Sequence, residues 1–187
     1  MDGLMIFLLL VIIVIAAVWL YIARQGDAEF VFLVDQRTAW VVEEFHEDSV
    51  TFSVKIPFIN RGSQDGTIMD AYTRHLLPFE QCDAVEVYSR LTNEALFRSD
   101  GYWESVIVPK HTGGTAVVTI RLTAKKGSIA TALADMVEMP VDIVYQVVAR
   151  SLWYISKNRL LFNADEARLA FERKQDHQRS EEREVLR

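Results

Sequence analysis

A run of twenty uncharged, mostly aliphatic residues from Leu4 to Ala23 constrains this chain more than any other feature. A helix rises about 1.5 Å per residue, so this run spans about 30 Å, the thickness of a bilayer's hydrocarbon core. Trp19 and Tyr21 lie near its end, where amphipathic rings prefer the membrane interface. A cleaved signal peptide usually starts with basic residues, whereas residues 1–3 carry only Asp2. The sequence therefore predicts a short N-terminus over residues 1–3 and one transmembrane helix over residues 4–23, which contacts the lipid bilayer.

The charges that flank this run indicate which side of the membrane carries the rest of the chain. Asp2 is the only charged residue before the run, whereas Arg24 follows it directly and Arg37 comes soon after. Basic residues near the end of a membrane helix favour the cytoplasmic side. We therefore expect a single-pass membrane protein whose soluble domain is cytoplasmic, and the extracytoplasmic alternative stays open.

Length and charge limit the classes of function for the remaining residues. The chain has 187 residues and a net charge of −6, and its acidic and basic residues are mixed rather than clustered. Nucleic-acid-binding proteins usually carry a basic stripe that faces the phosphates, so we expect no nucleic acid partner. Cys82 is the single cysteine, so no disulfide can form within the chain. We expect it to be a small, buried residue near the end of a strand.

Residues 24–164 are predicted to form one domain, in which β-rich stretches alternate with turns. The clearest stretch is Ser49–Ile59, where Val50, Phe52 and Val54 fall on one face and mostly polar residues on the other. Such alternation is typical of a half-buried strand. Pro57 lacks an N–H group and is expected near a strand end or on an edge. Further strands are expected over residues 29–34, 38–45, 67–75, 84–91, 95–98, 102–108, 116–122, 141–149 and 152–163.

Short strands at this spacing favour a mainly β fold, an immunoglobulin-like antiparallel β-sandwich. One short helix is expected over residues 128–136, because Ile129, Leu133 and Met136 have helical spacing and Pro140 follows them. Residues 165–187 contain thirteen charged residues and too little apolar surface to fold alone. We expect a charged helix or flexible tail there, and both a solvated segment and a docking peptide stay open.

The residues that carry catalytic or metal chemistry do not form a recognisable pattern. The histidines are scattered through the sequence, and Cys82 with His75 would supply at most two of the three or four ligands of a zinc site. No Gly-x-Ser-x-Gly elbow of a serine hydrolase occurs. We therefore predict no catalytic residues, no metal site, no cofactor and no enzymatic activity. The four histidines are His46, His75, His111 and His177.

Two aromatic-rich segments are the candidate contact surfaces of the domain. Tyr102 and Trp103 follow a predicted hairpin turn at residues 99–101, and aromatic side chains often dominate binding at interfaces. Packing in the core is the alternative for Trp103. The last predicted hairpin carries Arg150, Trp153 and Tyr154, whose alternative is cross-strand pairing of a basic stem with aromatic rings. These five residues form the predicted partner-binding set.

The segment from Ser49 to Asn163 resembles the WHy-type domain of atypical late-embryogenesis-abundant proteins. The resemblance implies an immunoglobulin-like sandwich, often anchored in a membrane, with no catalytic residues and with a role in stress protection or lipid binding. The family usually follows its asparagine with proline, whereas Arg61 follows here. The features that carry the resemblance are a strand ending in Asn60, a strand with Ile68, a strand over residues 117–122, a helix with Leu133 and a closing hairpin over residues 141–162.

Taken together, these features predict a non-enzymatic β-sandwich that binds a protein partner at the membrane surface, as a scaffold or assembly factor. The alternative is a module for lipid or another apolar ligand, which requires a cavity between the sheets. A membrane-bound enzyme would require a cluster of perturbed acids and bases in a cleft.

Overall fold

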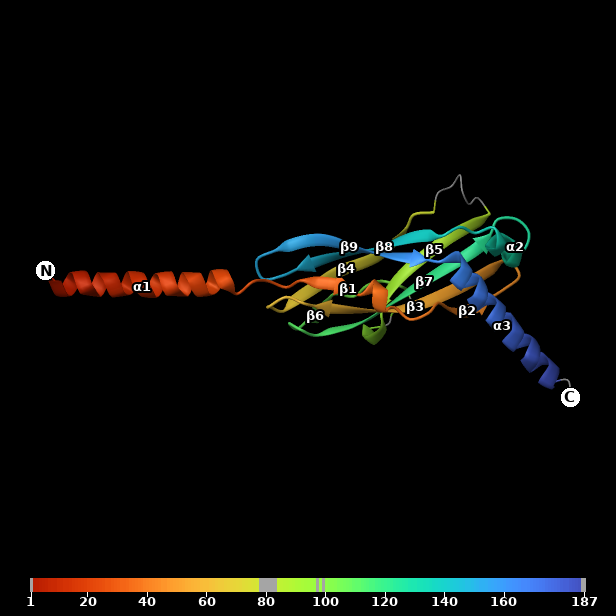
Figure 1. Cartoon of the computed structure of the whole chain (residues 1–187), viewed down its shortest axis with the longest axis horizontal. Coiled ribbons are helices and arrows are strands. Elements are labelled where there is room, and N and C mark those ends of the chain that lie inside the picture. The colour runs from red at the N-terminus through yellow and green to blue at the C-terminus, as the bar shows by residue number, and fades with distance from the viewer. Residues whose placement is uncertain (1, 78–83, 97, 99, 186–187) are drawn as a thin grey trace.

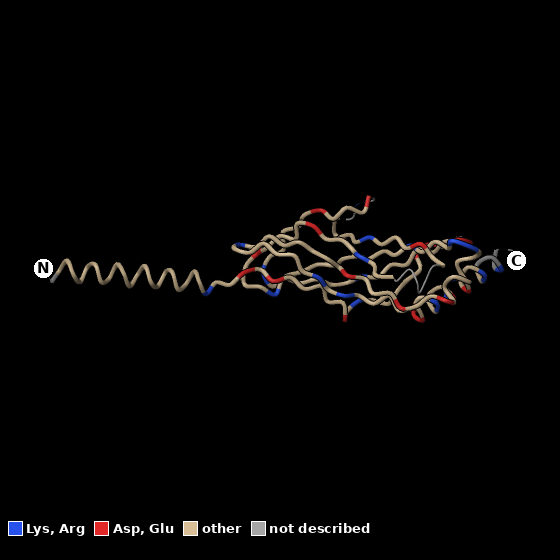
Figure 2. Tube along the Cα trace, turned by 90° about the horizontal axis from the view of Figure 1, so that it is seen from above, with Lys and Arg blue, Asp and Glu red and all other residues tan. Residues whose placement is uncertain are grey.

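The first helix, α1 (Asp2–Arg24), projects from one end of the molecule (Figure 1). The computed structural model describes residues 2–77, 84–96, 98 and 100–185, so the expectation for Cys82 lies outside the described residues. The apolar side chains of α1 are exposed, and the helix is long and apolar enough to cross a membrane. It carries no Lys or Arg before Arg24 (Figure 2). The predicted helix over residues 4–23 is therefore confirmed as a helix.

The rest of the chain folds into two antiparallel sheets, which confirms the mainly β sandwich. In sheet A the order is β1-β3-β7-β5, and β2 also pairs with β3. Its strands are β1 (Phe30–Phe32), β2 (Val41–Phe45), β3 (Ser49–Asn60), β5 (Val85–Asn93) and β7 (Gly113–Ala124). In sheet B the order is β6-β4-β8-β9. Its strands are β4 (Gly66–His75), β6 (Val106–Val108), β8 (Met139–Val148) and β9 (Trp153–Phe162).

Aromatic rings from both sheets meet in the space between them. Phe52 of β3 contacts Phe162 of β9 edge-on, with ring centroids 5.3 Å apart. Phe32 of β1 contacts Tyr145 of β8 at 4.9 Å. Aliphatic side chains at alternate strand positions fill the remaining space, among them Ile56, Ile68, Ile120, Leu122, Ile143 and Leu160. Burial of these apolar faces drives the two sheets together.

A turn is present at the predicted hairpin, where the Gly101 N–H donates to the Arg98 carbonyl at 3.1 Å, but the pairing of two strands across it is wrong; residues 97 and 99 lie outside the described residues. Strand β5 pairs with β7 in sheet A, whereas β6 pairs with β4 in sheet B, so the chain changes sheets between them. A 3-10 helix, η2 (Glu94–Leu96), follows β5 in place of the strand expected over residues 95–98. The ring of Trp103 lies 6.3 Å from Phe32 and 6.0 Å from Phe58, between ring centroids. Burial of this large side chain holds the segment after the turn against the core, so it does not continue as a hairpin strand.

Pro57 lies within β3, three residues before its end, and β3 has neighbours on both sides. The Lys55 carbonyl accepts a hydrogen bond from the Thr38 N–H at 3.0 Å. The Pro57 carbonyl accepts one from the Leu33 N–H at 2.8 Å. The backbone of Pro57 therefore faces the break between β1 and β2, where the 3-10 helix η1 (Val34–Gln36) replaces the ladder. A missing N–H group costs little at this position, because no strand partner lies opposite it.

Two further helices close the end of the sandwich that lies far from α1 (Figure 1). The short helix α2 (Ile129–Ala134) begins at Ser128, whose side chain accepts a hydrogen bond from the Thr131 N–H. The last helix, α3 (Ala164–Val185), projects away from the sandwich, and its first turns are not a solvated tail. Phe171 is buried, and its ring contacts that of Phe45 at 5.3 Å. Apolar contact therefore fixes the start of the charged segment predicted over residues 165–187.

Candidate functional site

The structure separates the five residues of the predicted partner-binding set. Trp103 is 1 % exposed, which confirms the alternative of core packing and removes its ring from any contact surface. Tyr102 is exposed, and the Arg98 guanidinium lies 5.6 Å from the centre of its ring. Arg150 lies in the turn between β8 and β9, whereas Trp153 and Tyr154 begin β9. The last hairpin is thus present as predicted, but Trp153 and Tyr154 point to opposite faces of β9 and Arg150 lies in the turn before them.

Tyr154 faces inward and joins β9 to β1. Its hydroxyl accepts a hydrogen bond from the Phe30 N–H at 3.1 Å and donates one to the Ala28 carbonyl at 3.4 Å. The side chain of Asn158 acts in the same way, since its Oδ1 accepts from the Phe32 N–H at 3.1 Å. Burial raises the pKa of Tyr154 above its usual value of 10.0. These side chains occupy outward N–H groups of β1 and connect sheet B to sheet A at this side of the sandwich.

The backbone of β9 leaves one edge of sheet B open. The Ala149 N–H donates to the Leu152 carbonyl at 2.8 Å, which fixes the register of the β8–β9 ladder. Backbone groups alternate between the two edges of a strand, so those of residues 153, 155, 157, 159 and 161 point away from β8. Within the described part of the chain, no backbone group pairs with them. An exposed edge of this length can take up a further strand.

The side chains of the same five residues form the β9 face, which we define as Trp153, Ile155, Lys157, Arg159 and Leu161. Trp153, Ile155 and Leu161 are exposed apolar residues, and Trp153 is 62 % exposed. Val148 of β8 lies opposite Trp153 and extends the apolar surface. The face therefore has apolar side chains at both ends of the strand and two basic side chains between them.

A buried carboxylate holds the two cations in place. Asp142 of β8 is 4 % exposed, and its carboxylate accepts from Arg159 Nε at 2.8 Å and from Lys157 Nζ at 3.0 Å. The hydrogen bond from Arg159 is the main cause that lowers the pKa of Asp142 to about 2, against the opposing effect of burial. One negative charge faces two positive charges, so the β9 face carries a net positive charge. An acidic side chain on a partner would complement it.

Two open grooves lie between the β9 strand and the segments of sheet A that approach it. One, of about 480 Å³, lies beside the first half of β9 and is lined by residues 27–31 on its other side. The second, of about 600 Å³, lies beside the second half and is lined by residues 34–39. The grooves leave space next to the open edge at both ends of the strand.

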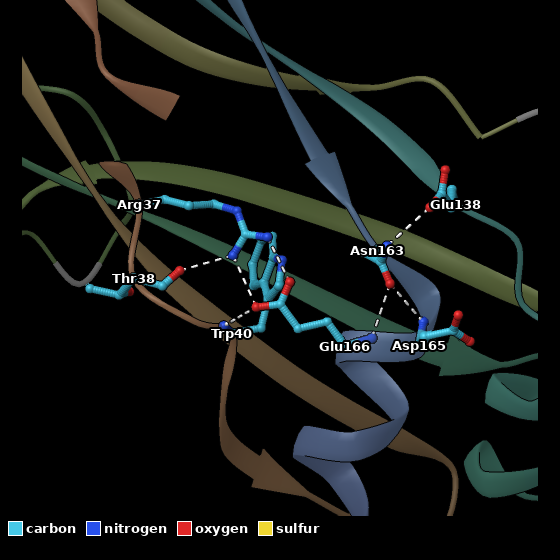
Figure 3. A network of polar contacts seen from close by, with 7 residues as sticks. All are labelled: Arg37, Thr38, Trp40, Glu138, Asn163, Asp165 and Glu166. Carbon is cyan, nitrogen blue, oxygen red and sulfur yellow. Dashed lines mark hydrogen bonds and ion pairs between the residues drawn. The ribbon is translucent and has the colours of Figure 1, made fainter. Parts of the chain in front are cut away.

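Ion pairs hold the wall of the second groove (Figure 3). Arg37 Nη2 lies 2.6 Å from Glu166 Oε2, and Arg37 Nη1 lies 3.0 Å from Glu166 Oε1. Glu166 Oε1 also accepts from the Trp40 N–H at 3.2 Å, and the hydrogen bond from Arg37 is the main cause that lowers the pKa of Glu166. Asn163 Oδ1 accepts from the N–H groups of Asp165 and Glu166, both at 3.0 Å, and so begins α3. This wall is therefore fixed, and the charges of Arg37 and Glu166 compensate each other.

Sequence reasoning identified Trp153 on this face and missed Ile155, Arg159 and Leu161. The available signal was the alternation of residues 153–161, which puts three apolar and two basic residues on one face of a strand. Among the described residues, no three metal-ligating side chains come together. His46 Nε2 instead lies 2.9 Å from Glu44 Oε1, within hydrogen-bond distance, and both side chains are exposed.

Comparisons with known proteins give no family for this chain. No protein-family model matches the sequence, and no curated protein is significantly similar to it. The putative ApaA protein from Bordetella pertussis is a similar solved structure, with 9 % identity over 73 % of this chain and 94 % of that chain and a TM-score of 0.40. The GAE domain of GGA2p from Saccharomyces cerevisiae has 9 % identity over 73 % of this chain and 98 % of its own, with a TM-score of 0.35. Likeness at this level carries no argument about function, and the resemblance to WHy-type domains stays a prediction.

Proposed function

We propose that this chain is a non-enzymatic, single-pass membrane protein whose sandwich binds an extended segment of a protein partner along the open edge of β9. The observation that carries the proposal is the coincidence of an unpaired backbone edge with an exposed, mixed apolar and basic face on the same strand. Strand addition of this kind gains main-chain hydrogen bonds, while alternate side chains give selectivity. We place the sandwich on the cytoplasmic side, from the positions of Arg24 and Arg37 after the membrane helix.

The β9 face specifies the chemistry of the partner segment. Trp153 and Ile155 favour apolar side chains opposite the first half of the strand, since aromatic and aliphatic surface is buried there on binding. The uncompensated positive charge of Lys157 and Arg159 favours an acidic side chain near the middle. The anchor holds this edge close to the membrane, which raises its effective concentration towards membrane-bound partners.

Photo-crosslinking in native membranes tests the site. A benzophenone side chain in place of Ile155 is expected to give a discrete adduct with a partner protein. The same group in place of Tyr88, which is equally exposed on β5 in the other sheet, serves as the matched control. Equal adducts at both positions, or none at Ile155, would contradict the proposed site.

A proline substitution separates backbone pairing from side-chain contact. The N–H group of Lys157 points to the open edge, so Lys157→Pro removes a donor from that edge and leaves the β8 ladder intact. Lys157→Ala removes the same side chain and keeps the N–H group. We expect Lys157→Pro to abolish the Ile155 adduct and Lys157→Ala to weaken it only in part. An equal loss in both variants would show that the backbone edge is not used.

The alternative function, a module for an apolar ligand, needs a cavity between the sheets. Aromatic and aliphatic side chains occupy that space, and the grooves found over the described residues are open to the surface. We therefore favour binding of a protein segment over enclosure of a lipid.

A further inference from the structure

One carboxylate holds the link between α1 and the sandwich, residues 25–29, to the β8–β9 turn. Asp27 Oδ1 accepts hydrogen bonds from the Ala28 and Arg150 N–H groups, at 2.9 and 2.8 Å. Asp27 Oδ2 accepts from the Ser151 N–H at 2.9 Å, from Ser151 Oγ at 2.6 Å and from the Leu152 N–H at 3.0 Å. Burial alone would raise the pKa of Asp27, but these hydrogen bonds outweigh it and lower the pKa to about 2. The side chain thus binds the whole β8–β9 turn to the link.

The opposite side of the link is bound to the β3–β4 turn. Ser63 N–H donates to the Asp27 carbonyl at 3.1 Å, and Arg61 N–H donates to the Glu29 carbonyl at 2.7 Å. Gly62 is required between them, since a Cβ there would lie 2.2 Å from the Asp27 carbonyl oxygen. With both turns attached, residues 27–29 do not act as a free tether, and the β8–β9 turn is fixed to the chain three residues after the end of α1.

A groove of about 410 Å³ lies where the last turn of α1 meets the β8–β9 turn. Ile22 and Ala23 line one wall, and Leu152, which is 55 % exposed, lines the other together with Arg150. The Arg150 guanidinium donates to the neutral side-chain oxygen of Gln25, and no acidic side chain pairs with it among the described residues. An exposed apolar side chain and a guanidinium that forms no ion pair among the described residues therefore lie directly beside the end of the membrane helix.

We propose that this junction binds phospholipids of the surrounding bilayer, with Leu152 in the interfacial layer and Arg150 against the lipid phosphates. Ile22 and Leu152 are exposed apolar residues that line the same groove, and Ile22 belongs to the apolar surface that α1 presents to the hydrocarbon core. Arginine recognises phosphate oxygens through paired N–H donors, and long basic side chains at helix ends reach the headgroup layer. The hydrogen bonds from the β8–β9 turn to the Asp27 carboxylate, which we call the Asp27 clamp, hold the sandwich in this position on the membrane. The inference rests on the anchor in the proposed function and is independent of the β9 edge.

Lipid quenching of site-specific fluorophores in the full chain tests the inference. On a Cys82→Ser background, single cysteines replace Leu152, Tyr88 or Leu10 and are labelled with an environment-sensitive dye. Nanodiscs contain equimolar phosphatidylcholine and phosphatidylglycerol with a spin-labelled lipid as quencher. We expect quenching of the dye at position 152, as at position 10 in the membrane helix, and none at position 88 on the outer face of sheet A.

Two variants connect this result to the named groups. Asp27→Ala is expected to abolish quenching at position 152 and leave position 10 unchanged, whereas Asp35→Ala, which removes the carboxylate of an exposed residue, changes neither. Quenching at position 152 is expected to be stronger in the equimolar nanodiscs than in nanodiscs of phosphatidylcholine alone, and Arg150→Gln should remove this difference. If the dye at position 152 behaves like that at position 88 in the unsubstituted chain, the lipid contact is refuted while the anchor stands. If position 10 is also unquenched, the anchor fails and this inference fails with it, even where the Ile155 adduct forms.

Discussion

Replacing Asp142 with asparagine tests whether the buried carboxylate stabilises the β9 face. The substitution keeps the size of the side chain and removes its charge, so Lys157 and Arg159 lose their shared partner. The pKa of Asp142 is lowered from 3.8 to about 2, and each unit of such a shift corresponds to about 1.4 kcal/mol. This gives roughly 2.5 kcal/mol as an upper value. The side chains of Lys157 and Arg159 are 60 % and 56 % exposed, so solvent screening reduces the expected loss to about 1–2 kcal/mol at pH 7.

The pH dependence of the effect has a definite sign. The folded pKa of Asp142 lies below the unfolded one, so its contribution is complete above about pH 4 and is lost as the pH falls towards 2. We expect the difference in the free energy of unfolding between the two proteins to be full at pH 7 and to fall to a small fraction near pH 2. Urea unfolding of the full chain in dodecyl maltoside micelles, followed by tryptophan fluorescence, measures it.

Asp100→Asn is the matched control for this measurement. Hydrogen bonding to Arg98 also lowers the pKa of Asp100 to about 2, but both side chains are about half exposed. Exposed ion pairs contribute little, so this variant should unfold at nearly the same urea concentration as the unsubstituted chain. A pH-independent loss for Asp142→Asn, or an equal loss in both variants, would refute the reasoning.

Three further predictions concern other parts of the chain. Asn60 is fully buried, and its side chain accepts hydrogen bonds from the Glu29 and Gly62 N–H groups and donates to two carbonyls. We therefore expect Asn60→Ala to lower the free energy of unfolding, measured in urea, by about 3 kcal/mol. A loss below about 1 kcal/mol would contradict this. Phe171→Ala should release α3 from the sandwich and speed tryptic cleavage within this helix. Leu169→Ala, at an exposed position of the same helix, should not change the rate of cleavage. Equal rates in both variants would show that Phe171 does not hold α3 on the sandwich. A reporter fused to the C-terminus should be active on the cytoplasmic side, and activity on the other side would overturn the argument from flanking charges.

The elements that sequence predicted well are those whose pattern is local. Alternation over residues 49–59 reproduces β3 to within one residue, because a period of two places every second side chain in the core. The closing hairpin of β8 and β9 is also confirmed, since two long β-rich stretches flank a short turn. Helix α1 could be predicted from its apolar run alone, without any knowledge of tertiary contacts.

The elements that sequence did not predict depend on partners far along the chain. The Asp-Gly pair at residues 100–101 suggests a hairpin locally, but the burial of Trp103 against Phe32 decides the path of the segment. Asp27 looks like part of a polar linker, and all of its donors except the adjacent Ala28 N–H lie more than 120 residues away in the sequence. The open edge of β9 follows from the order of strands in sheet B, which no local pattern contains. These are tertiary effects that override local preference.

The direction of β9 has a mechanical consequence. The strands of sheet B run lengthwise between α1 at one end and α3 at the other (Figure 1), and β9 begins next to the Asp27 clamp. A partner that pulls along β9 away from the membrane would load the β8–β9 ladder in shear, because ladder hydrogen bonds lie across the strands. The bonds would then share the force instead of opening one after another. Tension between a partner and the bilayer would thus be carried by the sheet and by the linker it is bonded to.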